Sequence, residues 1–240
     1  VFMKRVLIYI IIAIFIALVV QPNIVRDYTK KYRVPTNTTS TVATNDTTDL
    51  KICKSNATIC IDPGYSGVET YADSSKISAK DLSLALAKKI GDKLSTSGYN
   101  VVYTRSDNDF VNFTSDEDSC KERIYIAQDY GADYLLSLQL NNDSDSLSKG
   151  YTIFTQNDDK LIALGIAISS KLDAINFSQF QGLDSDHYGN FPILGEPDLK
   201  SIFIEFGYLT NTQDYTQLSD EAYQEKIGSA IAKAFLEKID

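Results

Sequence analysis

Histidine is nearly absent from this chain, since His187 is the only one among its 240 residues. There are also only three cysteines, Cys53, Cys60 and Cys120, and no two of them form a Cys-x-x-Cys pair. Imidazole and thiolate are the commonest zinc ligands in proteins. The sequence therefore excludes a zinc site built from several histidines or from paired cysteines.

The chain also has no excess of positive charge. The chain has 32 acidic and 23 basic residues, which gives a net charge of -9 at pH 7. Nucleic acids bind basic surfaces, so this balance argues against a nucleic-acid partner and against electrostatic attraction to anionic lipid or wall polymer. Hydrophobic residues make up 43% of the chain, which is enough for one sizeable core.

The N-terminal region contains one unbroken apolar run, Val6–Val20, which follows two basic residues. The run is shorter than the ~20 residues that usually span a bilayer, but flanking residues can extend it. No small-residue cleavage motif follows, so we expect residues 1–25 to be an uncleaved signal-anchor in a cell membrane. The rest of the chain would then lie on the extracytoplasmic side. The alternative is a cleaved signal peptide and a secreted protein.

We predict that residues 1–25 stay attached to the mature protein. Signal peptidase needs a small-x-small pattern, which the end of the apolar run lacks. The intact mass of the native protein should therefore include these residues. A mass lower by about the first 20 residues would contradict the anchor and favour secretion.

Residues 26–50 come next, and from residue 36 they are mostly Thr, Ser, Asn and Asp without hydrophobic periodicity. A segment of this composition cannot bury enough apolar surface to fold alone. We therefore expect a flexible linker over residues 26–50 and one folded domain over residues 51–240.

Strand-like and helix-like patterns alternate within that domain. Leu82, Leu86, Ile90 and Leu94 recur with helical spacing, and Gly98 ends that helix. Similar patterns predict helices over residues 80–97, 119–130, 160–175 and 220–239, strands over 59–61, 99–104, 134–138, 150–155 and 201–205, and an irregular segment over 179–197. This order predicts an α/β fold, a single three-layer domain in which helices flank a central, mostly parallel sheet.

Short motifs mark the ends of several of these elements. The first strand ends abruptly at Asp62-Pro63-Gly64, which places the following residue at the carboxyl edge of the sheet, where sites collect in α/β folds. The further motifs are Lys-Asp-Leu-Ser-Leu at 80–84, Gly-Tyr-Asn-Val-Val-Tyr-Thr-Arg at 98–105, Glu-Arg at 122–123, Gly-Ala-Asp at 131–133, Ser-Leu-Gln-Leu-Asn at 137–141 and Ile-Glu-Phe-Gly-Tyr-Leu-Thr-Asn at 204–211.

In this order and spacing, the motifs resemble those of the zinc-dependent N-acetylmuramoyl-L-alanine amidases, which are bacterial cell-wall hydrolases. The resemblance covers residues 57–239. The family has Asp-Pro-Gly-His-Gly-Gly at the first motif, Ser-Ile-His-Ala-Asn at 137–141, and Glu-Leu-Gly-Phe-Leu-Ser-Asn near 205–211. The resemblance implies an amidase or zinc-exopeptidase-like fold.

The resemblance also implies a zinc ion held by two imidazoles and one carboxylate, with a separate glutamate that moves protons. Carried onto this chain, the three ligand positions fall at Tyr65, Ala79 and Gln139, and the proton-moving glutamate falls at Glu205. A neutral phenol, a methyl group and a neutral amide are poor zinc ligands or none. The only nearby carboxylate is Asp81. We therefore predict no metal ligands at these positions and no cofactor.

Among the four positions that carry the chemistry in the family, only Glu205 has the residue type of the family motif. Because a lone glutamate neither activates water nor stabilises an oxyanion, we expect a structural role, bonded to the Tyr65 hydroxyl, the Gln139 amide or Arg123. Asn141 is expected to bind a ligand or to cap the turn after its strand. Tyr65, Gln139, Arg123 and Asn141 are thus the candidate binding residues.

Three functional hypotheses follow. The first is a non-catalytic, membrane-tethered domain that binds peptidoglycan or proteins of the cell-wall, division or sporulation machinery. The second is an active amidase that cleaves the bond between N-acetylmuramic acid and L-alanine with an atypical metal site. The third is a scaffold without glycan affinity. The ligand positions favour the first hypothesis, so the domain is predicted to be inactive.

Overall fold

The computed structural model describes residues 56–64, 77–107 and 115–239, all within one unit of the chain, residues 35–240. The expected anchor, the expected linker and Tyr65 lie outside the described residues. Within the described part, no helix has the length and apolar character needed to cross a membrane.

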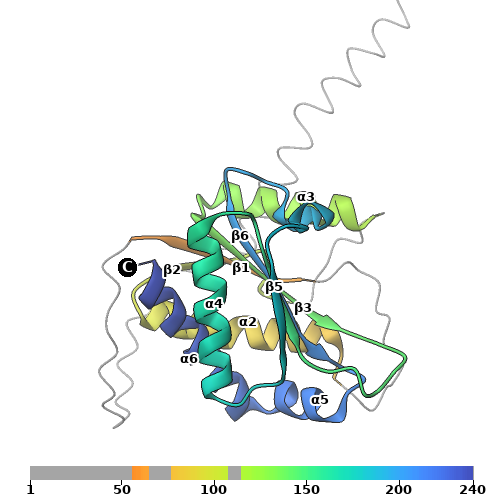
Figure 1. The fold of residues 1–240 in the computed structure, drawn as a ribbon. Coiled ribbons are helices and arrows are strands. Elements are labelled where there is room, and N and C mark those ends of the chain that lie inside the picture. Colours follow the sequence, from red (N-terminus) through yellow and green to blue (C-terminus); the bar gives the residue numbers. More distant parts are fainter. Residues whose placement is uncertain (1–55, 65–76, 108–114, 240) are drawn as a thin grey trace, which may run out of the picture. The chain divides into compact units, whose positions relative to one another are not determined.

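A six-stranded sheet forms the centre of the fold, with the strand order β2-β1-β3-β6-β4-β5 (Figure 1). The strands are β1 (Thr58–Pro63), β2 (Asn100–Tyr103), β3 (Tyr134–Asn141), β4 (Tyr151–Thr155), β5 (Phe180–Asp184) and β6 (Lys200–Tyr208). Every pairing is parallel except that of β4 with β6. The prediction of a central, mostly parallel sheet is therefore confirmed.

Helices cover both faces of this sheet (Figure 1). They are α2 (Ala79–Thr96), α3 (Asp116–Asp129), α4 (Asp159–Ala174), α5 (Thr212–Ser219) and α6 (Glu221–Lys238), with short 3-10 turns η1 (Tyr188–Asn190) and η2 (Pro192–Leu194). The larger core packs α2, α4 and α6 against one face, and the smaller core packs α3 and η2 against the other. The three-layer prediction is confirmed.

The largest packing layer depends on a close approach between α2 and α6. Leu86, Ile90 and Leu94 of α2 are fully buried, as is Ile231 of α6. At Gly228 of α6, a Cβ atom would lie 2.7 Å from the Lys89 carbonyl oxygen of α2. Only glycine permits this backbone contact, which brings the two apolar faces together.

Polar side chains close the amino ends of the helices. The Ser78 hydroxyl accepts a hydrogen bond from the Asp81 N–H at the start of α2, and Ser115 does the same for Asp118 in α3. Asp158 and Asp220 cap α4 and α6 in the same way. Each cap satisfies an otherwise unpaired N–H group, which typically stabilises a helix by about 1 kcal/mol.

Two elements were not predicted from the sequence. The segment 179–197, which was expected to be rich in loops, contains β5 together with η1 and η2. β5 reads Phe-Gln-Gly-Leu-Asp, which has no β-branched residue, so pairing with β4 rather than local propensity makes it a strand. The short helix α5 was not predicted because it buries only Asp214 and Leu218.

Candidate functional site

Strand register brings Gln139 and Glu205, two of the predicted site positions, onto one face of the sheet. Asp62 of β1, Ser137 of β3 and Phe203 of β6 are direct partners across the sheet. Gln139 and Glu205 are partners in the next row on the same face, because side chains alternate along a strand. Phe203 belongs to the smaller core, so this is the face that α3 and η2 cover.

Glu205 has a hydrogen-bond partner that the sequence analysis did not name. Its Oε2 atom accepts a hydrogen bond from Asn141 Nδ2 at 2.9 Å, and both side chains are half-buried. Gln139 lies opposite Glu205 in register, and its side chain is exposed. The strand also continues beyond Glu205 to Tyr208, so the glutamate lies within β6 and not at its end.

Arg123 of α3 contacts Asp62, in the row of side chains that precedes Gln139 and Glu205. Its guanidinium donates hydrogen bonds to Asp62 Oδ2 at 2.5 Å, to Cys120 Sγ at 3.0 Å and to the Ser119 carbonyl oxygen at 3.4 Å. None of these partners is Gln139 or Glu205, and the Arg123 side chain is only 16% exposed. Contact of Arg123 with a ligand therefore stays a prediction.

The two described cysteines provide no nucleophile. Cys60 and Cys120 are both buried free thiols. Burial raises the pKa of Cys60 well above its usual value, and the neighbouring Asp62 carboxylate raises it further. Burial also raises the pKa of Cys120, more strongly than the nearby Arg123 lowers it. Both thiols are thus protonated at neutral pH, and thiolate chemistry is excluded at these positions.

Asp62 holds the site together, a role that the sequence analysis missed. The residue is fully buried. Its Oδ1 atom accepts a hydrogen bond from Thr104 Oγ1 at 2.6 Å, and Oδ2 accepts from Ser137 Oγ at 2.6 Å and from Arg123. The carboxylate therefore ties β1 to the residue after β2, to β3 and to α3. An aspartate inside a buried strand and directly before Pro-Gly was the available signal.

Arg105 fixes the start of α2, where Ala79 is the first helical residue. The Arg105 guanidinium donates to the Pro63 carbonyl oxygen at 2.9 Å, to the Lys80 carbonyl oxygen at 2.9 Å and to Ser83 Oγ at 3.0 Å. Burial lowers the pKa of Arg105 to about 10, so it remains charged at neutral pH. This side chain joins the end of β1 to the beginning of α2.

The donor set does not fit zinc. Ala79 carries a methyl group and Gln139 a neutral amide at two of the three positions that the resemblance assigns to ligands. In residues 56–64, 77–107 and 115–239, no group of three His, Cys, Asp or Glu side chains could hold a metal ion. The only histidine, His187, is exposed and pairs through Nδ1 with Asp184 Oδ2 at 2.9 Å. No chemical step through zinc follows from these residues.

Two cavities lie on the face that carries Gln139 and Glu205. One of about 170 Å³ lies between α3 and η2, lined by Gly64, Asp116, Cys120, Arg123, Ser137, Gln139, Phe191, Pro192, Ile193 and Phe203. The other, of about 390 Å³, lies over β4 and β5 and is lined by Thr152, Phe154 and residues 181–187. Gln139 lines the first cavity, which therefore adjoins the predicted site.

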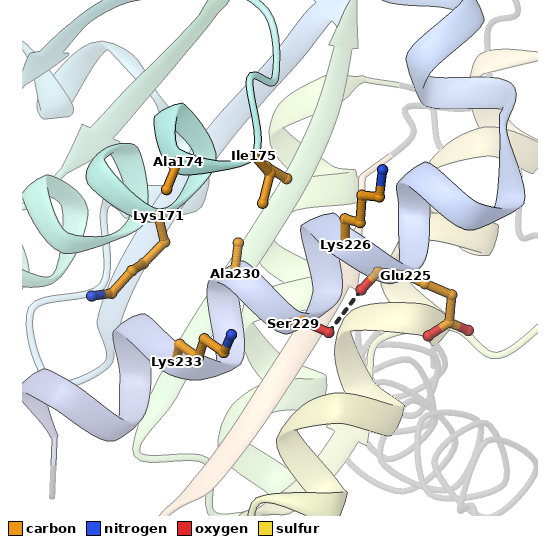
Figure 2. A pocket seen from close by; sticks show the side chains of 8 residues that line it. All are labelled: Lys171, Ala174, Ile175, Glu225, Lys226, Ser229, Ala230 and Lys233. Atoms are coloured by element: carbon orange, nitrogen blue, oxygen red, sulfur yellow. Dashed lines mark hydrogen bonds between the residues drawn. The ribbon is translucent and has the colours of Figure 1, made fainter. Parts of the chain in front are cut away.

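A third cavity is separate from this face. It has a volume of about 330 Å³ and lies between α4 and α6, the helices that cover the opposite face of the sheet (Figure 2). Lys171, Lys226 and Lys233 surround its apolar floor. The Lys171 ammonium pairs with Glu237 at 2.7 Å, and the Lys226 ammonium lies over the Tyr223 ring. None of the predicted site residues lines this cavity.

Comparison with protein families and curated proteins points to one family. Residues 59–237 match the family model described as N-acetylmuramoyl-L-alanine amidase. YqiI of Bacillus subtilis (strain 168), an uncharacterized protein, is 30% identical over 72% of this chain and 81% of its own length. The N-acetylmuramoyl-L-alanine amidase LytC of the same organism is 29% identical over 80% of this chain, but over only 38% of its own length.

Solved structures agree with this match. The N-acetylmuramoyl-L-alanine amidase from Clostridium difficile 630 superposes with a TM-score of 0.66 at 29% identity, over 78% of this chain and 98% of that chain. The CwlD amidase from Clostridioides difficile, solved in complex with the GerS lipoprotein, gives a TM-score of 0.62 at 26% identity, over 77% and 98% of the two chains.

We predict that Asp62→Asn lowers the free energy of unfolding by about 3–5 kcal/mol, because it leaves the Arg123 charge without its buried partner. Urea denaturation followed by circular dichroism measures the loss. Asp129→Asn, on the exposed end of α3, is the matched control and should stay within about 0.5 kcal/mol of the parent.

The double variant Asp62→Asn/Arg123→Met separates the ion pair from the packing around it. Since it also removes the stranded cation, it should cost less than the sum of the two single changes. A loss below about 1 kcal/mol for Asp62→Asn, or full additivity of the two changes, would show that this carboxylate does not hold the site together.

Proposed function

Because the chain belongs to the N-acetylmuramoyl-L-alanine amidase family, we propose that its folded domain binds peptidoglycan without cleaving it. The observation that carries this proposal is the donor set on the amidase scaffold. Ala79 and Gln139 stand where the family resemblance places a carboxylate and an imidazole. Gln139 lines the cavity between α3 and η2, which offers space for a ligand.

Glu205 alone does not supply amidase chemistry. Cleavage of an amide needs an activated water and a group that stabilises the oxyanion, and zinc provides both in the related enzymes. In this chain the Glu205 carboxylate accepts a hydrogen bond from Asn141, on the strand next to its own. This bond satisfies one acceptor and supports a role for Glu205 in fixing the carboxyl edge of β3 and β6.

The second candidate function is an active amidase with an atypical metal site. The position of Glu205 favours it, because the carboxylate is half-buried, lies opposite Gln139 and keeps the proton-moving position of the family. The named relative LytC is an N-acetylmuramoyl-L-alanine amidase. Metal dependence of any peptidoglycan cleavage separates this candidate from the first.

We further propose that the domain acts outside the cytoplasmic membrane, tethered through residues 1–25, and that its partners include peptidoglycan or proteins of the wall machinery. The apolar run Val6–Val20 supports the tether. The solved complex of the CwlD amidase with the GerS lipoprotein supports the idea that amidase scaffolds of this family also bind proteins.

Incubation of the full chain with purified peptidoglycan tests the first candidate function. We expect the protein to sediment with the insoluble polymer and to release no stem peptides, with the same result after EDTA treatment. Release that disappears with EDTA or with Glu205→Ala would establish the active amidase instead. Failure to sediment would contradict peptidoglycan binding and leave the scaffold hypothesis.

A rescue variant tests whether the residues at the three ligand positions account for the expected absence of zinc binding. Tyr65→His, Ala79→Glu and Gln139→His together restore two imidazoles and a carboxylate, so this triple variant should bind one zinc ion tightly. The parent and the matched double variant Tyr65→His/Ala79→Glu should keep no stoichiometric zinc after dialysis, as measured by elemental analysis. Stoichiometric zinc in the parent, or none in the triple variant, would contradict the assignment of these positions.

A further inference from the structure

The cavity between α4 and α6, of about 330 Å³, has an apolar floor and a rim of lysines (Figure 2). We call it the α4–α6 hollow. A volume near 300 Å³ lies at the lower end of the range for binding pockets, so the hollow has space for one or two side chains of a partner. The floor comprises Ala174, Ile175 and Ala230, and the rim comprises Lys171, Lys226 and Lys233.

The hollow is basic although the whole chain carries a net charge of -9. Its one carboxylate, Glu225, forms ion pairs with Lys93 at 2.7 Å and with Lys89 at 2.9 Å, and the hydrogen bonds of these lysines lower its pKa. Lys226 and Lys233 are both exposed, and neither pairs with a carboxylate in the described ranges. The rim therefore offers two ammonium groups to an acidic partner.

The outer face of α3 carries the opposite charge. Glu122, Tyr125 and Asp129 follow one another at helical spacing and therefore share one face of this helix. The Tyr125 side chain is 43% exposed, and the Asp129 carboxylate is exposed between its neighbours on the last turn.

Glu122 is the unusual member of this face. It is half-buried, and burial raises the pKa of its carboxyl group. Within the part of the chain that the structure describes, neither Glu122 nor Asp129 has a hydrogen bond or an ion pair through its carboxylate. Because a desolvated charge is costly unless it is paired, a cation from another molecule would stabilise Glu122.

The charges of the two surfaces have the same spacing. Glu122 and Asp129 lie seven residues apart on α3, and so do Lys226 and Lys233 on α6. An α-helix rises 1.5 Å per residue, so each pair spans about 10.5 Å. If the two helices run antiparallel, Glu122 lies opposite Lys233 while Asp129 lies opposite Lys226.

The same arrangement places Tyr125 at the floor of the hollow. Tyr125 follows Glu122 by three residues, and Ala230 precedes Lys233 by three, so the ring lies level with the Ala230 methyl group. A small side chain at this position lets the ring approach the floor and bury apolar surface. A simple polyanion would pair with the lysines and leave this floor uncovered.

The two surfaces cannot meet within one molecule. The smaller core packs α3 against one face of the sheet, and the larger core packs α4 and α6 against the other. Each copy can, however, offer α3 to one neighbour and its hollow to another. A contact between two different surfaces is heterologous, and it forms open chains unless its rotation closes a ring.

We propose that copies of this chain associate head to tail, with Glu122, Tyr125 and Asp129 of one copy in the α4–α6 hollow of the next. This goes beyond the proposed function, because neither Gln139 nor Glu205 belongs to either surface. One helix in one groove buries less than a standard interface of about 1,600 Å², so the association should be weak, with a dissociation constant of about 10–100 μM.

Sedimentation velocity of the full chain in a nonionic detergent tests the association. The average mass should rise between about 1 and 100 μM, around the expected dissociation constant. Lys226→Gln/Lys233→Gln should raise this constant about tenfold, as expected for the loss of two exposed ion pairs. The control Lys88→Gln/Lys160→Gln removes two exposed lysines outside the hollow and should associate like the parent.

A second double variant, Glu122→Gln/Asp129→Asn, alters the other surface and should weaken the association by the same factor. A mixture of the two double variants gives the sharpest test. The lysine variant keeps its acidic α3, and the acidic variant keeps its basic hollow, so one unaltered interface forms between them. The mixture should give 1:1 dimers with the affinity of the parent and no longer chains, because both outer surfaces of that dimer are altered.

Four results would overturn this inference, and none of them bears on peptidoglycan binding. A parent that stays monomeric would exclude a second copy from the hollow and leave it to an acidic segment of another protein. Association that persists in both double variants would assign the contact to other residues. A mixture that stays monomeric would show that the two surfaces do not bind each other. Parent dimers that never lengthen with concentration would contradict a head-to-tail contact.

Discussion

The carboxyl edge of the sheet depends on the hydrogen bonds and the ion pair of the buried Asp62 carboxylate. Burial of a charge is costly unless it is paired and hydrogen-bonded, and here Thr104, Ser137 and Arg123 supply those partners. Because these residues belong to separate parts of the chain, the charge is satisfied only when β1, β3 and α3 are assembled. The next backbone N–H, that of Gly64, then bonds the Leu138 carbonyl oxygen at 2.8 Å and continues the ladder.

The position of the candidate site follows from this assembly. Once Asp62, Ser137 and Phe203 are aligned, the pleat places Gln139 and Glu205 in the next row on the same face. Asn141 then reaches Glu205 from the adjacent strand. The fold therefore presents these side chains through strand register, whatever chemistry they carry.

Much of this architecture could be predicted from sequence, because the spacing of apolar residues in a long amphipathic segment indicates which of its residues are buried. The stripe from Leu82 to Leu94 placed α2 within about one residue, inside the usual error of such boundaries. β5 and α5 were not predicted because tertiary contacts stabilise them. These contacts are the pairing with β4 for β5 and the hydrogen bonds of Asp214 for α5. The bond between Asn141 and Glu205 depends on register across two strands, which periodicity along one strand does not encode.

The residues that stabilise this fold are different from the residues at the expected metal-ligand positions. The fold can therefore form with Ala79 and Gln139 at two of those positions. In a structural zinc site, metal binding supplies folding free energy, so loss of its ligands unfolds the domain. Here the exposed Gln139 and the half-buried Ala79 lie outside both apolar cores, while Asp62 and Arg105 join the surrounding elements without any metal. Substitution at Ala79 or Gln139 therefore changes the chemistry available at the carboxyl edge and leaves the contacts that build this edge in place.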